Sequence, residues 1–353
     1  MTSKIAAIKQ YGQKIWLDNI SREFLASGDL QTMMQEDGIA GVTSNPAIFY
    51  KAISSDSRYQ EQLNELKKTN LNPLQRYEKM AVDDIKQACA IMQPLYVTSS
   101  GEDGYVSLEV LPALCHDTDG TVESALELWN AVNAPNLMIK VPATQAGVAA
   151  FEQLVALGLN VNITLLFSLP QVNAIWEAYI SALEKRADQG LPIDKIKTVA
   201  SFFLSRVDSA VDPKLPEALQ GKTAINLARA AYLDYQKLFN SPRFNKLKDL
   251  GAKGQYLLWA STGTKNKNYS DILYIEELIG DETINTVPDA TLNAYRDHGN
   301  AASRLTNGIQ NATTILAQVE QNGIDLIELG DKLQQEGLQS FIEAFDKLID
   351  LVK

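Results

Sequence analysis

Eight short apolar segments recur along this chain of 353 residues, and stretches rich in helix-forming residues separate them. Short apolar runs bounded by Pro, Gly or Asn are typical of buried strands. Strands that alternate with helices in this way indicate parallel βαβ units. We therefore expect strands over residues 14–18, 38–46, 105–112, 136–142, 159–167, 198–206, 254–261 and 283–288.

Eight strand–helix units fit a (β/α)8 barrel, or TIM barrel. A doubly wound open sheet is the structural alternative, but no strand-to-helix turn carries the glycine-rich fingerprint of a dinucleotide site. The chain from residue 293 onward has a helical, amphipathic pattern. We predict one barrel domain over residues 1–353, in which residues 300–353 form a C-terminal helical extension packed on the barrel.

The segments between the strands have helical spacing of apolar residues. Residues 21–37 read as one helix, and residues 53–92 as two or more helices with a break near Asn72 and Pro73. Ser168 is expected to N-cap a helix, and Gly158 to end one. Further helices are expected over residues 121–134, 144–157, 222–239 and 271–279.

The charge balance and the scarcity of Cys and His exclude several classes of function. The chain has 43 acidic and 32 basic residues and a net charge of -11, which argues against a broad surface for nucleic acid or anionic membranes. Its two cysteines and two histidines form no metal-binding or disulfide pattern. No apolar signal segment or membrane-span-length run is visible. We expect a cytoplasmic protein without a metal or cofactor.

One lysine interrupts the fourth apolar segment. Lys140 stands in the middle of Asn136-Leu-Met-Ile-Lys-Val-Pro-Ala-Thr144. Burial disfavours an ammonium group, and the same penalty yields the free amine that a Schiff base requires. The alternative is a lysine that extends from the strand end to solvent. This segment alone does not decide between the two.

The two-residue alternation of strands sorts these side chains into two faces. In four of the expected strands one face is wholly aliphatic, while the other carries isolated polar groups near the C-terminal end. Active sites of (β/α)8 barrels form at that end. Seven polar residues are therefore expected to converge on one mouth: Asp18, Asn45, Glu109, Lys140, Asn162, Thr164 and Ser201.

A lysine with two carboxylates and no metal ligands favours carbonyl chemistry through an imine. The amine attacks a ketone or aldehyde, and the iminium accepts the electrons of an adjacent C–C bond as that bond breaks. Carboxylates serve the proton transfers of imine formation and cleavage. The residues alone thus indicate an enzyme like the class I aldolases, without identifying its substrate.

Four motifs, in order along the chain, resemble those of the transaldolase family: Thr43–Pro46, Val106–Val110, Leu137–Thr144 and Val161–Ser168. Trp259–Asn266 and Tyr274–Gly280 are similar to the longer bacterial branch of that family. The resemblance covers nearly the whole chain. It implies a barrel of the class I aldolase type with additional C-terminal helices.

The resemblance also implies a reaction, in which a dihydroxyacetone unit passes from sedoheptulose 7-phosphate to glyceraldehyde 3-phosphate. The products are erythrose 4-phosphate and fructose 6-phosphate, within the non-oxidative pentose phosphate pathway. Lys140 would form the Schiff base, and Asp18 would take and return the hydroxyl proton. Glu109 and Thr164 would position a water molecule. The remaining roles are hydroxyl binding by Asn45 and Asn162 and pocket lining by Ser201 and Phe203.

The phosphate end departs from the family pattern. Arg206 stands where the family has a phosphate-binding arginine, and its fork geometry suits a phosphate. The alternative is a surface or helix-start arginine paired with Asp208. Many members have Ser-Phe-Arg after the seventh strand, whereas this chain has Ser261-Thr-Gly-Thr-Lys265. Lys265 is the expected point-charge substitute.

Two other functions remain as alternatives. A fructose-6-phosphate aldolase would release the three-carbon unit to water, but that family commonly has a tyrosine where this chain has Glu109. A catalytically silent barrel would have lost the lysine or its partners, and all are present. We expect sugar-phosphate substrates, no nucleic-acid or membrane partner, and a monomer or homodimer.

Overall fold

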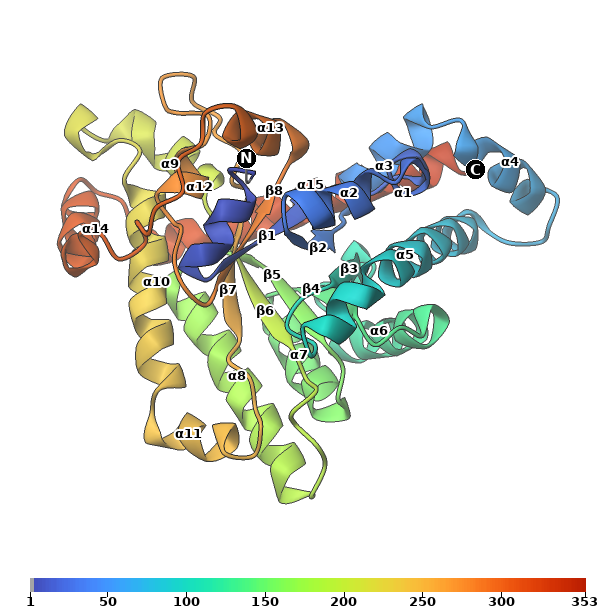
Figure 1. Cartoon of the computed structure of the whole chain (residues 1–353), viewed down its shortest axis with the longest axis horizontal. Coiled ribbons are helices and arrows are strands. Elements are labelled where there is room, and N and C mark those ends of the chain that lie inside the picture. Colours follow the sequence, from blue (N-terminus) through green and yellow to red (C-terminus); the bar gives the residue numbers. More distant parts are fainter. Residues whose placement is uncertain (1–2) are drawn as a thin grey trace.

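The computed structural model describes residues 3–353 and contains a closed barrel of eight parallel strands in sequential order (Figure 1). The prediction of a (β/α)8 barrel is confirmed, and the closed order excludes the open sheet. The strands are β1 (Gln13–Asp18), β2 (Ile39–Thr43), β3 (Tyr105–Glu109), β4 (Leu137–Pro142), β5 (Val161–Leu166), β6 (Thr198–Phe203), β7 (Tyr256–Ala260) and β8 (Thr283–Val287).

Helices surround the strands and cover their outer faces (Figure 1). The α-helices are α1 (Arg22–Ser27), α2 (Asp29–Glu36), α3 (Pro46–Ser55), α4 (Arg58–Lys67), α5 (Pro73–Thr98), α6 (Thr118–Val132), α7 (Gln145–Leu157), α8 (Leu169–Asp188), α9 (Ser205–Val211), α10 (Thr223–Phe239), α11 (Pro242–Lys248), α12 (Leu273–Glu276), α13 (Asp289–His298), α14 (Ala312–Gln321) and α15 (Leu326–Leu351). Short 3-10 helices are η1 (Ala6–Tyr11), η2 (Pro112–Leu114), η3 (Asp212–Lys214), η4 (Glu217–Leu219) and η5 (Ile309–Asn311).

Local sequence signals account for several helix boundaries. Asn72 caps α5 in a capping box, and Pro73 occupies the first turn, which confirms the expected break. Gly158 ends α7 in a left-handed conformation, also as expected. The prediction of one helix over residues 21–37 was wrong, because Gly28 adopts φ +85 and separates α1 from α2. Ser168 does precede α8, but its hydroxyl makes no capping hydrogen bond.

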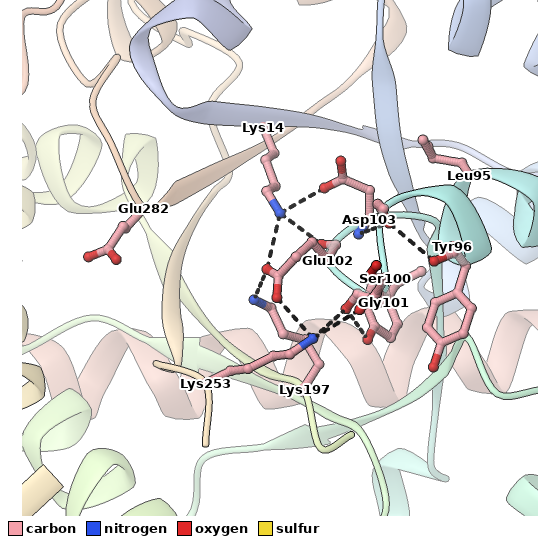
Figure 2. Close-up of polar contacts among 12 residues, drawn as sticks. Lys14, Leu95, Tyr96, Ser100, Gly101, Glu102, Asp103, Lys197, Lys253 and Glu282 are labelled. Carbon is pink, nitrogen blue, oxygen red and sulfur yellow. Dashed lines mark hydrogen bonds and ion pairs between the residues drawn. The ribbon is translucent and has the colours of Figure 1, made fainter. Parts of the chain in front are cut away.

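A cluster of charged side chains lies at the N-terminal end of the barrel (Figure 2). Lys197 and Lys253 place their ammonium groups 2.8 and 2.9 Å from the Glu102 carboxylate, and Lys14 lies 2.8 Å from Asp103. Burial lowers the pKa of Lys197 to about 8, although Glu102 opposes this shift. Burial would raise the pKa of Glu102, but Lys197 and the other lysines lower it to about 2. Glu102 therefore supplies the counter-charge that this buried end requires.

We expect Glu102→Gln to lower the free energy of unfolding by about 2 kcal/mol at pH 7, because Lys197 then lies buried without a counter-ion. The partial exposure of Glu102 places this value below the range of about 3–5 kcal/mol for a fully buried pair. A group with a depressed folded-state pKa stabilises above its ordinary pKa of 4.5, and that stabilisation falls away toward about pH 2. Urea unfolding should therefore show a smaller difference between wild type and variant at pH 3.5 than at pH 7.

The matched control for this variant is Glu177→Gln. Glu177 pairs with Arg243 at 2.7 Å, but both side chains are exposed, so removal of its charge should change the free energy of unfolding by less than about 0.5 kcal/mol. Equal effects of the two substitutions would contradict the importance of the buried cluster.

The C-terminal helix α15 crosses the barrel (Figure 1). It packs against α3, α5, α8, α9 and the end of β5. Its far end is tied to α5, where Arg76 donates a hydrogen bond to the carbonyl of Lys353. Within residues 3–353, no helix combines the length and apolar character needed to span a membrane. The crossing places α15 over the C-terminal ends of the strands.

Candidate active site

The strand register aligns the polar side chains of neighbouring strands at the C-terminal end of the barrel. Glu109 of β3 is paired with Lys140 of β4, and Lys140 with Asn162 of β5. Thr164 is paired with Pro142, two residues further along both strands. On the other side of the barrel Asp18 of β1 is paired with Thr43 of β2. The register therefore holds the polar residues expected from alternation close to one another at this end of the barrel.

Lys140 and Glu109 form a largely buried ion pair. The Lys140 Nζ atom lies 2.8 Å from a Glu109 carboxylate oxygen, and the two side chains are 7% and 10% exposed. Lys140 also donates a hydrogen bond of 3.1 Å to the backbone carbonyl of Ser44. Burial raises the pKa of Glu109, while the charge of Lys140 and its hydrogen bond counteract this effect. Lys140 thus points into the barrel and does not extend to solvent.

Asp18 forms a second carboxylate centre beside the lysine. The Thr43 hydroxyl donates a hydrogen bond of 2.7 Å to Asp18 and lies 2.7 Å from the hydroxyl of Thr286 on β8. Burial raises the pKa of Asp18, and the charge of Lys140 and the Thr43 hydrogen bond oppose that rise. The nearby carboxylate of Asp289 raises it further. The net shift is upward, toward a pKa at which Asp18 can exchange protons nearer neutrality.

Asn162 lies below the cavity surface, where it orients its neighbours. The Ser201 hydroxyl donates to the Asn162 side-chain oxygen at 2.7 Å, and the Asn162 amide donates to the hydroxyl of Ser107 at 3.1 Å. Thr164 is also buried, but its hydroxyl has no hydrogen-bond partner among the described residues. Thr164 therefore presents to the cavity a hydroxyl that is not hydrogen-bonded within residues 3–353, unlike Asn162 and Ser201.

Most of the expected site residues line a cavity of about 250 Å³. Its wall includes seven of the ten residues selected from the sequence: Asp18, Asn45, Lys140, Thr164, Ser201, Phe203 and Arg206. Glu109 contacts the cavity through Lys140, and Asn162 through Ser201. Asn45 uses its side-chain oxygen to cap α3, which leaves its NH2 group to face a ligand.

Arg206 lines this cavity, and Lys265 carries a second positive charge near Arg206. Arg206 is in the first turn of α9 and lies over the ring of Phe203. It is not paired with Asp208, whose carboxylate accepts hydrogen bonds from the Ala224 backbone and the Tyr274 hydroxyl. Lys265 is exposed in the loop after β7 and is not part of the cavity wall. Desolvation and then the charge of Arg206 lower the pKa of Lys265, so the two cations lie close enough to repel each other.

Part of the cavity wall was not predicted from the sequence. Thr43 and Thr286 form the hydroxyl chain beside Asp18. Thr43 could have been found, because it precedes Asn45 by two residues and so falls on the same face of the strand expected over residues 38–46. The helix α15 contributes Ser340, Phe341 and Ala344, and the Phe341 ring centroid lies 5.8 Å from Lys140 Nζ. Amphipathic spacing predicts a buried face of this helix, but not which partner it faces.

Comparisons with known proteins assign the chain to a family. A family model described as transaldolase/fructose-6-phosphate aldolase matches residues 15–352. A transaldolase from Neisseria meningitidis is 49% identical to this chain over 98% of both sequences. A transaldolase from Thiobacillus denitrificans is 46% identical over 97% of both. A transaldolase 2 from Nostoc punctiforme is 44% identical and covers 99% of this chain and 96% of its own. The chain therefore belongs to the transaldolase/fructose-6-phosphate aldolase family of enzymes.

Proposed function

We propose that this enzyme transfers a dihydroxyacetone unit between sugar phosphates through a Schiff base on Lys140. The donor is sedoheptulose 7-phosphate, the acceptor is glyceraldehyde 3-phosphate, and the reaction belongs to the non-oxidative pentose phosphate pathway. The observation that carries this proposal is a largely buried amine on a cavity wall, 2.8 Å from one carboxylate and influenced by the charge of a second. The names of the relatives support the same activity.

Imine formation begins with the neutral amine of Lys140. Glu109 accepts the ammonium proton, and the amine then attacks the ketone carbon of the donor. The former carbonyl oxygen receives one proton from the attacking nitrogen and one from Glu109, which returns to its carboxylate form, and it leaves as water to give the iminium ion. The upward-shifted pKa of Glu109, caused by burial and opposed by Lys140, suits a group that takes and returns protons. The free hydroxyl of Thr164 supports its role as a holder of the water molecule.

Cleavage of the C–C bond follows, with Asp18 as the base. Asp18 accepts the proton of the hydroxyl on the carbon that becomes the aldehyde. The bonding electrons move into the iminium, which becomes an enamine, and the aldehyde departs. The same steps in reverse join the enamine to the acceptor aldehyde. The hydrogen bond from Thr43 fixes the carboxylate for both directions. Asn45 and Ser201 are suited to hold the hydroxyls of the bound unit, and Asn162 orients Ser201.

Helix α15 covers Lys140, and this cover favours transfer of the three-carbon unit to an aldehyde over its release to water. The Phe341 ring and two further residues of α15 close one side of the cavity, and exclusion of water protects a reactive intermediate from hydrolysis. Turnover of fructose 6-phosphate should therefore depend on added erythrose 4-phosphate. Fast turnover without this acceptor would instead support the fructose-6-phosphate aldolase activity.

The phosphate group of the substrate is assigned to Arg206, with Lys265 as a second cation. Arg206→Met should lower kcat/KM for fructose 6-phosphate roughly tenfold to a hundredfold, which corresponds to a lost charge-assisted hydrogen bond. Turnover of unphosphorylated fructose should be nearly unchanged. Lys265→Met should have a smaller effect of the same kind, about threefold to tenfold, because this residue is exposed and lies outside the cavity wall.

The control for this loop is Lys267→Met, since Lys267 is an exposed lysine two residues away. It should retain the wild-type preference for the phosphorylated sugar. The assignment of Lys265 fails if Lys265→Met and Lys267→Met give the same steady-state constants for both sugars.

A further inference from the structure

One side chain of α15 joins the ends of the two strands that carry the reacting lysine and its neighbours. The side-chain NH2 group of Gln334 donates a hydrogen bond of 2.9 Å to the backbone carbonyl of Ala143 and one of 3.0 Å to that of Leu165. Ala143 directly follows β4, which holds Lys140, and Leu165 directly follows Thr164 in β5. A single amide group thus connects both strands at the mouth of the barrel.

The backbone at this point departs from regular strand geometry. Leu165 adopts φ +64, a left-handed conformation that is unfavourable for residues other than glycine. The pairing of β5 with β6 shifts register between Ile163 and Leu166. Just before Leu165, β4 and β5 are joined by a backbone hydrogen bond of 2.8 Å from the Ala143 N–H to the Thr164 carbonyl. An unfavourable conformation persists only where surrounding contacts fix it, and it is common at functional sites.

The helix is shaped to bring Gln334 to these carbonyls. Gly330 and Gly337 lie on the same helix face, one turn before it and about one turn after it. A β-carbon at Gly330 would lie 2.6 Å from Ser168 Cβ, and one at Gly337 would lie 2.9 Å from Leu165 Cδ2. Only glycine therefore allows this close approach. Further along the same face, Phe341 lies over Lys140.

We propose that Gln334 is a positioning residue for the reaction. It holds the β4 and β5 ends in the conformation that aims Lys140 and Thr164 at the substrate carbonyl. This inference rests on the proposed Schiff-base function and adds a requirement to it. Helix α15 covers the cavity, and it also raises the rate of imine formation through the hydrogen bonds of Gln334 to the strand backbone. Gln334 touches no reacting atom, so its effect passes through the two strands.

The test compares Gln334→Met with Gln334→Lys. Methionine keeps the length of the side chain and removes its donors, whereas lysine supplies N–H donors that can reach both carbonyls. We expect Gln334→Met to lower kcat, and the single-turnover rate of borohydride-trapped adduct on Lys140, by the same factor of roughly ten to a hundred. The KM for fructose 6-phosphate should change by less than about threefold. Gln334→Lys should restore most of both rates.

The control is Gln335→Met, which makes the same substitution on the exposed face of the same helix and should leave both rates at wild-type values. Assays are run at a temperature where circular dichroism shows every variant folded. Gln334→Glu is a second, independent variant that keeps the shape of the side chain but has no N–H donors at neutral pH. Its kcat and trapping rate should fall as they do in Gln334→Met.

Three results would overturn the inference: a wild-type kcat in folded Gln334→Met, a lower melting temperature with unchanged rates, or no recovery in Gln334→Lys. Absence of any adduct in the wild type would instead contradict the Schiff-base function itself, so the two failures are distinguishable.

Discussion

Replacement of Lys140 by methionine should abolish transfer of the three-carbon unit, with a fall in kcat/KM of roughly 10⁴-fold or more. Among the residues that line the cavity within residues 3–353, Lys140 is the only lysine, and no other group there can form an imine with the substrate. Methionine preserves most of the side-chain volume. Glu109 loses its ionic partner, so its pKa, already raised by burial, should rise further. A coupled assay of the aldehyde product measures the loss.

Lys197→Met is the matched control for this variant. Lys197 is also a buried lysine 2.8 Å from a glutamate (Figure 2), but it directly precedes β6 and so lies at the N-terminal end of the barrel. Its replacement should leave kcat and KM at wild-type values, since Glu102 still has Lys14 and Lys253 as partners. Equal loss of activity in both variants would indicate a general effect of removing a buried lysine.

Asp18→Asn should lower kcat by roughly 10²-fold to 10⁴-fold and leave imine formation intact. Asparagine keeps the shape of the side chain, but it cannot accept the hydroxyl proton as the C–C bond breaks. Borohydride should therefore still trap an adduct on Lys140 in this variant, now as the uncleaved sugar phosphate. Mass analysis separates this adduct from the three-carbon one. Loss of all trapping in Asp18→Asn would place Asp18 in imine formation instead.

The pH dependence offers a check on the same residue. The pKa of Asp18 is raised by burial and then by the carboxylate of Asp289, so the acid limb of kcat should lie above the ordinary value of 3.8. Asp289→Asn removes one negative charge and should move that limb to lower pH while most of kcat remains at neutral pH. A limb that moves to higher pH would contradict this electrostatic account.

The sequence was sufficient for the order of the strands and for the faces they present, although the expected strands over residues 38–46, 105–112 and 198–206 each run three residues past the observed ends. Two-residue alternation placed Asp18, Lys140, Thr164 and Ser201 on the inner face, and the cavity wall includes all four. Alternation succeeds there because one face of each strand must be apolar to pack against the helices. Alternation does not show which inward polar groups reach the surface of the cavity. Asn162, for example, lies beneath that surface and is hydrogen-bonded to Ser201.

The features that the sequence did not predict depend on contacts between distant segments. The left-handed Leu165 is held where Gly337 and Gln334 of α15 approach it, about 170 residues further along the chain. The burial of Lys197 was also missed, because it stands before its strand and outside the apolar run. A buried lysine therefore does not identify a nucleophile by itself. Position at the C-terminal end of the barrel distinguishes Lys140 from Lys197.

The Schiff base is the central claim, and trapping tests it most directly. Fructose 6-phosphate and borohydride are added to the wild-type enzyme, and intact mass and peptide mapping follow. The account predicts one reduced dihydroxyacetone adduct per chain, located on Lys140 and absent from Lys140→Met. An enzyme that turns over without any adduct, or an adduct that persists on another lysine in Lys140→Met, would contradict it.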